Sequence, residues 1–106
     1  MKVVMTRTAS ESLWPIYLYH SDYSQDYAEA FQYEIDRFIL EHLSSNPLLG
    51  HLYHESRGIR RLIFQKRYSI YYPVRDNTVF VLFIFDRMGI NQEIEEHGLD
   101  TDDLIG

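Results

Sequence analysis

Hydrophobic residues first recur at helical spacing near the start of the chain. Leu13, Ile16, Tyr17 and His20 repeat at the spacing that is typical of one face of a helix. Pro15 falls inside this segment, and proline is tolerated only in the first turn of a helix, where its missing N–H would have no partner. We therefore predict that Ser12 caps this helix and that Pro15 takes its third position.

A second, longer helix is predicted from a cap at Ser24 to about residue 43. Its apolar side chains form one continuous stripe, while most of its acidic residues lie off that stripe and face water. The stripe consists of Ala28, Phe31, Ile35, Phe38, Ile39, His42 and Leu43. The following segment, SSNPLLG at residues 44–50, contains the proline and glycine that end the helix.

Runs of β-branched and aromatic residues predict strands at residues 2–8, 59–64, 68–74 and 78–85. The RDN sequence at residues 75–77 is typical of the turn in a hairpin. Pro73 cannot donate a ladder hydrogen bond, so it indicates a strand end or a local edge. The segment rich in histidine and tyrosine before residue 59 is expected to be a loop.

The order strand, helix, helix, strand, strand, strand predicts an α+β fold. Two amphipathic N-terminal helices would pack on one face of an antiparallel sheet. Residues 79–85, VFVLFIF, have no polar face, and the helices can cover only one of the two faces. Because monomers rarely expose a large apolar patch, the other face needs a cover. The candidates are the C-terminal segment of the chain or another polypeptide.

Length and composition narrow the class of protein. The 106 residues predict one domain. The absence of cysteine excludes disulfides and thiolate metal sites. No stretch approaches the roughly 20 apolar residues of a membrane span, and no signal peptide is recognised. We expect a cytoplasmic protein without a cofactor, a metal site or a membrane partner.

The formal net charge of −6 argues against nonspecific binding to nucleic acid. The charges are unevenly placed, however, because residues 57–75 contain no acidic residue and residues 88–106 contain no Lys or Arg. The basic residues of the first segment are Arg57, Arg60, Arg61, Lys66, Arg67 and Arg75, and the acidic residues of the second are Glu93, Glu95, Glu96, Asp100, Asp102 and Asp103. The chain thus divides into a domain at residues 1–90 and an acidic tail at residues 91–106.

The acidic tail has two interpretations. It can be a solvated end of the chain, or it can fold back on the basic strands. In the second case its apolar residues would touch the open apolar face of the sheet. These residues are Ile94, Leu99, Leu104 and Ile105.

Residues 58–86, GIRRLIFQKRYSIYYPVRDNTVFVLFIFD, resemble the C-terminal sheet of the RelE/ParE superfamily of toxin–antitoxin toxins. NPLLG at residues 46–50 is similar to the Pro-x-x-Gly piece that ends a helix in these proteins, and the strand–helix–helix opening also fits. The resemblance covers about residues 1–87. It implies that an antitoxin binds the sheet and helices, by strand addition or by helix packing in a groove. The sheet residues expected to contact it are Tyr71, Val79, Val81, Phe83 and Phe85.

The superfamily divides by target, and the resemblance is closer to its ParE-like members. RelE-like members cleave mRNA on the ribosome, whereas ParE-like members inhibit DNA gyrase. The sequence favours a protein inhibitor over an enzyme, because Ser69 stands where RelE-like proteins have arginine. Also, no tyrosine follows Tyr72. We expect Arg60, Arg61, Arg67 and Arg87 to contact gyrase.

Two alternatives remain open. The chain can be a RelE-like ribosome-dependent mRNA endoribonuclease, with Arg60, Arg67 and Arg87 neutralising phosphate charge. It can also be a non-toxic relative that retains antitoxin binding. No direct sequence-specific nucleic acid binding is expected, and the sequence does not decide whether the protein forms a homodimer. His20 and His42 are expected to be packed or capping residues.

Overall fold

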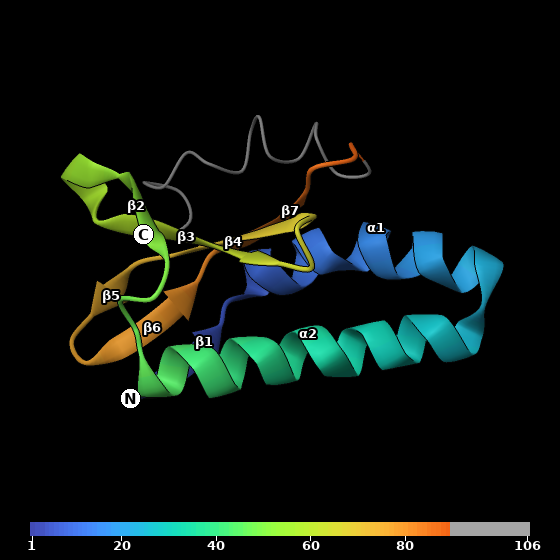
Figure 1. Ribbon diagram of the computed structural model, residues 1–106, viewed down its shortest axis with the longest axis horizontal. Coiled ribbons are helices and arrows are strands. Elements are labelled where there is room, and N and C mark those ends of the chain that lie inside the picture. Colours follow the sequence, from blue (N-terminus) through green and yellow to red (C-terminus); the bar gives the residue numbers. More distant parts are fainter. Residues whose placement is uncertain (90–106) are drawn as a thin grey trace.

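The computed structural model describes residues 1–89, which form two helices on one side of a mostly antiparallel sheet (Figure 1). The elements are β1 Lys2–Met5, α1 Arg7–Tyr23, α2 Gln25–Ser45, β2 His51–His54, the 3-10 helix η1 Glu55–Arg57, β3 Ile59–Phe64, β4 Tyr68–Tyr72, β5 Val74–Arg75, β6 Thr78–Val81 and β7 Phe83–Asp86. The α+β class is therefore confirmed. The predicted acidic tail at residues 91–106 lies outside the described residues.

The cap of helix α1 lies six residues before the cap predicted at Ser12. Thr6 is the cap: its hydroxyl accepts a hydrogen bond from the backbone N–H of Ala9 (3.2 Å) and donates one to the carbonyl of Val81 (2.7 Å). The predicted start was wrong because the bond to Val81 ties the helix start to a strand 75 residues away. Pro15 consequently lies inside the helix.

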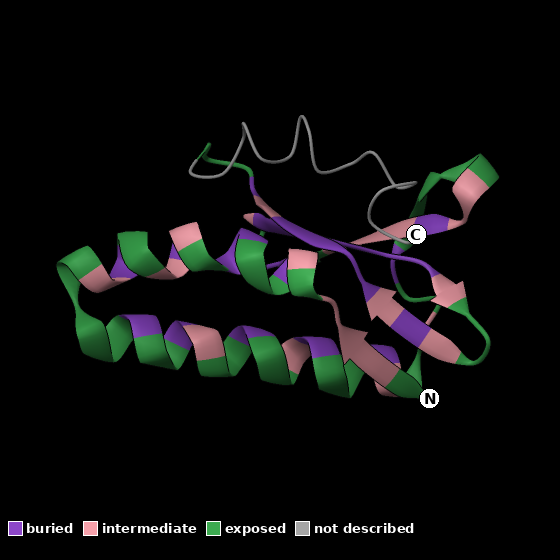
Figure 2. Ribbon diagram, turned by 180° about the vertical axis from the view of Figure 1, so that it is seen from behind, coloured by how far each residue is buried: buried purple, intermediate pink, exposed green. Residues whose placement is uncertain are grey.

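Helix α2 follows the prediction closely. Ser24 caps it by accepting a hydrogen bond from the backbone N–H of Tyr27 (3.1 Å). Its buried residues are Ala28, Phe31, Ile35, Ile39 and Leu43. Seen from behind, both helices turn their buried residues toward the sheet and their exposed residues outward (Figure 2). Local capping and one apolar stripe were enough to define this helix.

The strand order is β1-β6-β5 in one part of the sheet and β2-β3-β4-β7 in the other. Two hydrogen bonds join the parts, from the N–H of Phe80 to the carbonyl of Pro73 (3.1 Å) and from the N–H of Leu82 to the carbonyl of Tyr71 (2.9 Å). Strand β1 pairs parallel with β6, whereas the other strand pairs are antiparallel. The expectation of a purely antiparallel sheet is wrong for β1, because the chain between β1 and β6 passes through both helices and strands β2 to β5 and so supplies the long crossover that parallel strands need.

The structure also adds a strand that the sequence analysis treated as a loop. Strand β2 pairs with β3, with a register irregularity between Leu52 and His54. All of its residues are exposed, so burial leaves no alternating pattern from which the strand could be predicted.

The uninterrupted apolar run at residues 79–85 is explained by a one-residue slip at Leu82. Val79, Val81 and Ile84 belong to the core beneath the helices. Leu82 and Phe83 both belong to a cluster on the opposite face, where Leu82 bonds to Tyr71 and Phe83 is the register partner of Tyr71. Two residues facing one is the geometry of a β-bulge. The run is apolar throughout because both faces of this strand are buried.

Candidate partner-binding surface

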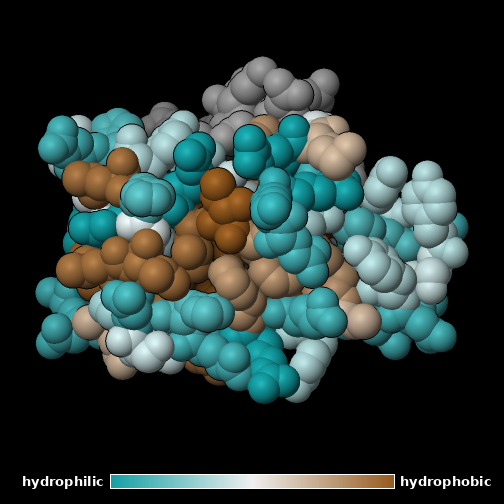
Figure 3. Space-filling model, viewed as in Figure 1, coloured by the Kyte–Doolittle hydropathy of each residue, from teal (hydrophilic) through white to brown (hydrophobic). Residues whose placement is uncertain are grey.

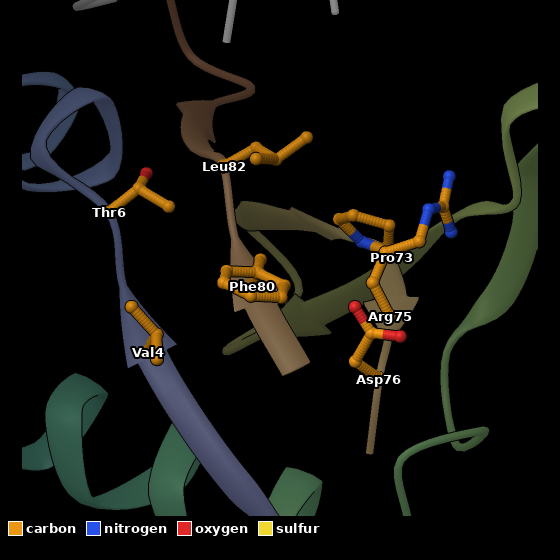
Figure 4. A pocket seen from close by; sticks show the side chains of 7 residues that line it. All are labelled: Val4, Thr6, Pro73, Arg75, Asp76, Phe80 and Leu82. Carbon is orange, nitrogen blue, oxygen red and sulfur yellow. The ribbon is translucent and has the colours of Figure 1, made fainter. Parts of the chain in front are cut away.

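The face of the sheet opposite the helices, hereafter the far face, is hollowed over β1, β6 and β5. The hollow has a volume of about 500 Å³. Its lining residues are Val4, Thr6, Pro73, Arg75, Asp76, Phe80 and Leu82 (Figure 4). Hydrophobic surface gathers in the half of the molecule that contains β5 and β6 (Figure 3). An apolar hollow with a few polar groups is typical of a binding site.

Strand alternation places the apolar lining of this hollow. Val3 and Met5 pack against the helix-covered core, so Val4, between them, points to the far face. Phe80 lies between the buried Val79 and Val81 in the same way. Pro73, which interrupts the strand between β4 and β5, keeps its carbonyl as an acceptor for β6. The sequence thus directs apolar side chains to both faces of this part of the sheet.

The polar residues around the hollow are engaged in bonds that hold the fold. The hydroxyl of Thr6 donates to the carbonyl of Val81. The guanidinium of Arg75 donates to the carbonyl of Arg57 (2.5 Å) and to its neighbour Val74 (3.1 Å).

The five residues expected to contact an antitoxin do not share one face. Tyr71 and Phe83 belong to the far-face cluster, and Phe85 packs against it. Val79 and Val81 lie instead in the core beneath the helices, and both are fully buried. The structure corrects the placement of these two valines, because the slip at Leu82 and the strand alternation turn them away from the far face.

The four arginines expected to contact gyrase lie in two pairs at opposite ends of β3 and β4. Arg60 is the register partner of Tyr72, and its guanidinium donates to the carbonyl of Gly50 (2.8 Å). Arg61 follows it in the strand and therefore points to the other face. Its guanidinium carbon lies 5.7 Å from the ring centre of Tyr53.

The second pair lies at the turn between β3 and β4. Arg67 precedes β4, and its backbone carbonyl accepts a hydrogen bond from the N–H of Arg87 (3.0 Å). The exposed side chain of Arg87 donates to the carbonyl of Lys66 (3.4 Å). The four-arginine set predicted from the sequence is therefore divided over two places. Its role in gyrase contact stays a prediction.

Arg67 is bound by a carboxylate that the sequence analysis did not single out. Its Nε and Nη2 atoms lie 2.8 and 3.0 Å from the two carboxylate oxygens of Asp86, which is fully buried. The backbone N–H of Met88 also donates to Asp86 (3.0 Å). The hydrogen bond to Asp86 is the main reason that the pKa of Arg67 is raised. A two-bond arginine–carboxylate pair of this kind is strong and directional.

Beside this ion pair lies a buried histidine–tyrosine contact. The Nε2 atom of His20 is 2.8 Å from the hydroxyl of Tyr68. Burial, followed by the charge of Arg67, lowers the pKa of His20, and burial raises the pKa of Tyr68 to about 12. Both groups are therefore neutral at pH 7. His20 is packed as predicted, whereas the side chain of His42 is exposed.

Three features considered in the sequence remain: a metal site, a membrane span and the fold-back of the tail. Within residues 1–89 no three His, Cys, Asp or Glu side chains are grouped so that they could hold a metal ion. Across the same residues, neither helix is apolar enough over a sufficient length to span a membrane. The expected fold-back of Ile94, Leu99, Leu104 and Ile105 lies outside the described residues.

Comparison with known proteins does not assign the chain to a family. No protein-family model matches the chain, and no curated protein is significantly similar to it. The resemblance to the RelE/ParE superfamily therefore stays a prediction carried by residues 46–50 and 58–86. The finding that stands is an α+β protein with an apolar hollow on the sheet face that its helices leave open.

Proposed function

We propose that this protein is the toxin of a type II toxin–antitoxin module. It acts as a ParE-like inhibitor of DNA gyrase and is neutralised by a cognate antitoxin. The resemblance of residues 58–86 to the RelE/ParE sheet supports the family, and the element order of residues 1–89 is consistent with it.

The observation that favours binding over RNA cleavage is the way in which the basic residues are bonded and buried. RNA cleavage needs an acid, a base and cations positioned around one phosphate. Arg67 is held by both oxygens of Asp86, and Arg60 is held by a backbone carbonyl at the other end of the strand pair. His20, which could exchange protons near neutral pH, is only 5% exposed. Two of the three arginines that a nuclease would use, Arg60 and Arg67, are thus engaged by protein oxygens, and His20 is buried.

The far-face hollow favours the proposal that the partner is a protein. Its apolar lining suits an apolar side chain of an antitoxin, because burying such a side chain contributes about 1.5–3 kcal/mol. Arg61 and Arg87 supply exposed or half-buried positive charge outside the hollow. On gyrase such cations contribute mainly to the rate and specificity of association. The proposed mechanism is binding to a gyrase state in which cut DNA is not resealed.

The test is gyrase-catalysed supercoiling of relaxed plasmid in the presence of the purified full chain. The proposal predicts loss of supercoiled product together with trapped, cleaved plasmid. Arg87→Ala should weaken this inhibition, whereas Arg7→Ala, which changes a cation at the start of α1 with 92% of its side chain exposed, should not. Normal supercoiling at a large excess of protein would reject the gyrase target. Cleavage of mRNA on translating ribosomes would then identify the nuclease alternative.

A further inference from the structure

Two hollows on the helix side of the molecule share Met5 and Asp36 as lining residues. The first has a volume of about 270 Å³ and lies between β1 and α2, and the second has a volume of about 170 Å³ and lies between α1 and α2. The other lining residues are Val3, Ile39 and Leu40 in the first hollow and Ser10, Leu13, Trp14 and Gln32 in the second. Because they share two residues, the hollows form one furrow, hereafter the helix furrow.

The β1 end of the helix furrow leaves apolar side chains accessible. Among the described strands, β1 lies at the edge of its sheet. Leu40 is 56% exposed, and Val3 and Met5 are half-buried. Apolar surface in a hollow is stabilised when a ligand removes it from water, so this end suits aliphatic side chains of a bound segment.

The other end of the helix furrow is marked by Trp14, whose side chain is 58% exposed. Its indole ring stacks on the ring of Tyr17, with 5.6 Å between the ring centres and 11° between the planes. The hydroxyl of Tyr17 accepts a hydrogen bond from the side-chain amide of Gln25 (2.7 Å). An exposed aromatic ring that is held in this way is a favourable contact for a guanidinium or ammonium group.

The polar side chains at the Trp14 end can accept hydrogen bonds. The Nε2 atom of Gln32 donates to both carboxylate oxygens of Asp36 (3.1 and 3.0 Å), which holds the carboxylate where the two hollows meet. An ionised carboxylate has about four acceptor sites, so it can accept further bonds. Gln32 and Ser10, which line the same hollow, carry further acceptor oxygens. Arginine, with five N–H donors in a planar fork, matches this arrangement best.

The charge of the two helices favours the same kind of ligand. Helices α1 and α2, which run side by side (Figure 1), contain seven acidic residues and two arginines. Each arginine is paired within its own helix, Arg7 with Glu11 (3.4 Å) and Arg37 with Glu41 (2.6 Å). This acidic surface repels the same surface of a second copy, and residues 90–106 contain no Lys or Arg. The occupant that fits is therefore a basic segment of another protein.

We propose that the helix furrow binds a basic segment of a partner protein, with an arginine of that segment between Trp14 and Asp36 and its aliphatic side chains beside β1. Lys2 and the amino terminus precede Val3 at the β1 end, so the cation of the partner is placed at the Trp14 end. The inference does not rest on the proposed gyrase target. It gives the protein a second binding surface, on the opposite side of the sheet from the far-face hollow.

Trp14 is the single tryptophan of the sequence, so its fluorescence in the full chain reports directly on the helix furrow. The probe is a synthetic peptide, blocked at both ends, of three leucines followed by three arginines. In its control peptide, citrulline replaces each arginine and keeps the shape of the side chain without its charge. Asp36→Asn removes the carboxylate charge but keeps an oxygen that accepts from Gln32. The matched control is Asp76→Asn, which changes an exposed aspartate outside the helix furrow.

A second pair of variants tests the apolar end of the helix furrow. Leu40→Ser removes its most exposed apolar side chain, and Leu48→Ser is the matched control, because Leu48 lies outside the helix furrow and is 60% exposed. Both leucines are exposed, so neither change is expected to unfold the protein.

The proposal predicts a saturable change in Trp14 fluorescence, with the arginine peptide binding about fivefold or more tightly than the citrulline peptide. Asp36→Asn should raise the Kd about threefold and Asp76→Asn less than about 1.5-fold. Leu40→Ser should raise the Kd about twofold and Leu48→Ser should leave it unchanged. Added salt should weaken the binding, since it screens the charge attraction.

Four results would overturn the proposal. The first is a fluorescence signal that does not saturate, and the second is equal binding of the two peptides. The third is an Asp36→Asn effect no larger than that of Asp76→Asn, because the cation would then bind elsewhere on the acidic helices. The fourth is a change in Trp14 fluorescence when the protein alone is diluted, because a second copy would then occupy the helix furrow.

Discussion

Replacing Arg67 with alanine is expected to destabilise the protein by about 2–3 kcal/mol. Removing one partner of a buried ion pair typically costs about 3–5 kcal/mol, because the remaining charge stays buried without its counterion. Asp86 is fully buried, but the side chain of Arg67 is 26% exposed. Water can therefore partly take its place, which reduces the expected loss. The N–H of Met88 also continues to bond to the carboxylate.

The free energy of unfolding is measured by urea titration followed by far-UV circular dichroism. Arg87→Ala is the matched control, because the side chain of this neighbouring arginine is exposed and donates a long bond to a carbonyl, while its backbone bond to Arg67 is kept by alanine. It should change stability by less than about 0.5 kcal/mol. A double-mutant cycle with Asp86→Asn should give a coupling energy of about 1–2 kcal/mol. A loss below about 0.5 kcal/mol for Arg67→Ala, or no coupling, would refute the idea that this pair holds β7 to the β3–β4 turn.

Three further predictions follow from local geometry. Thr6→Ala should lower the free energy of unfolding by about 1–2 kcal/mol, because it removes both the cap of α1 and the bond to Val81; urea titration checks this, with the exposed Ser10→Ala as control. Gln65 and Lys66 both have positive φ (53° and 58°), so Gln65→Asn with Lys66→Gly should stabilise the protein by about 0.5–1 kcal/mol; a lower melting temperature would contradict this. Because the pKa of His20 is lower in the folded protein, the unfolded chain binds more protons, so stability should fall as the pH drops below 6.5. His20→Gln should flatten this dependence, and an unchanged slope would assign it to other groups.

The parts of the fold predicted correctly are those that local sequence determines. Helix α2 has its own cap at Ser24 and its own apolar stripe, and the turn at Asp76 and Asn77 has the positive φ values that a tight hairpin requires. Helix α1 was predicted to start too late because its cap is fixed by a bond between Thr6 and Val81. Strand β2 was missed because its exposed residues show no alternation. Long-range pairing, rather than propensity, decides these features.

The candidate site, too, could be predicted only in part from the sequence. Apolar content on both faces of residues 79–85 was visible in the sequence, and the structure confirms that apolar side chains of this run lie on both faces of the sheet. The slip at Leu82 was not visible, because Val79, Val81, Leu82 and Phe83 are all apolar and alternation alone cannot show where it shifts by one. The partner of Arg67 was missed for a different reason. Asp86 lies 19 residues away, and only the pairing of β4 with β7 brings the two together.

Gyrase activity measured against increasing amounts of the purified chain decides whether the protein is a gyrase inhibitor. If it is, supercoiling of relaxed plasmid falls as protein is added, cleaved plasmid accumulates, and Arg87→Ala requires more protein for the same effect. Full supercoiling without cleaved plasmid, at protein in large excess over gyrase, would show that it is not.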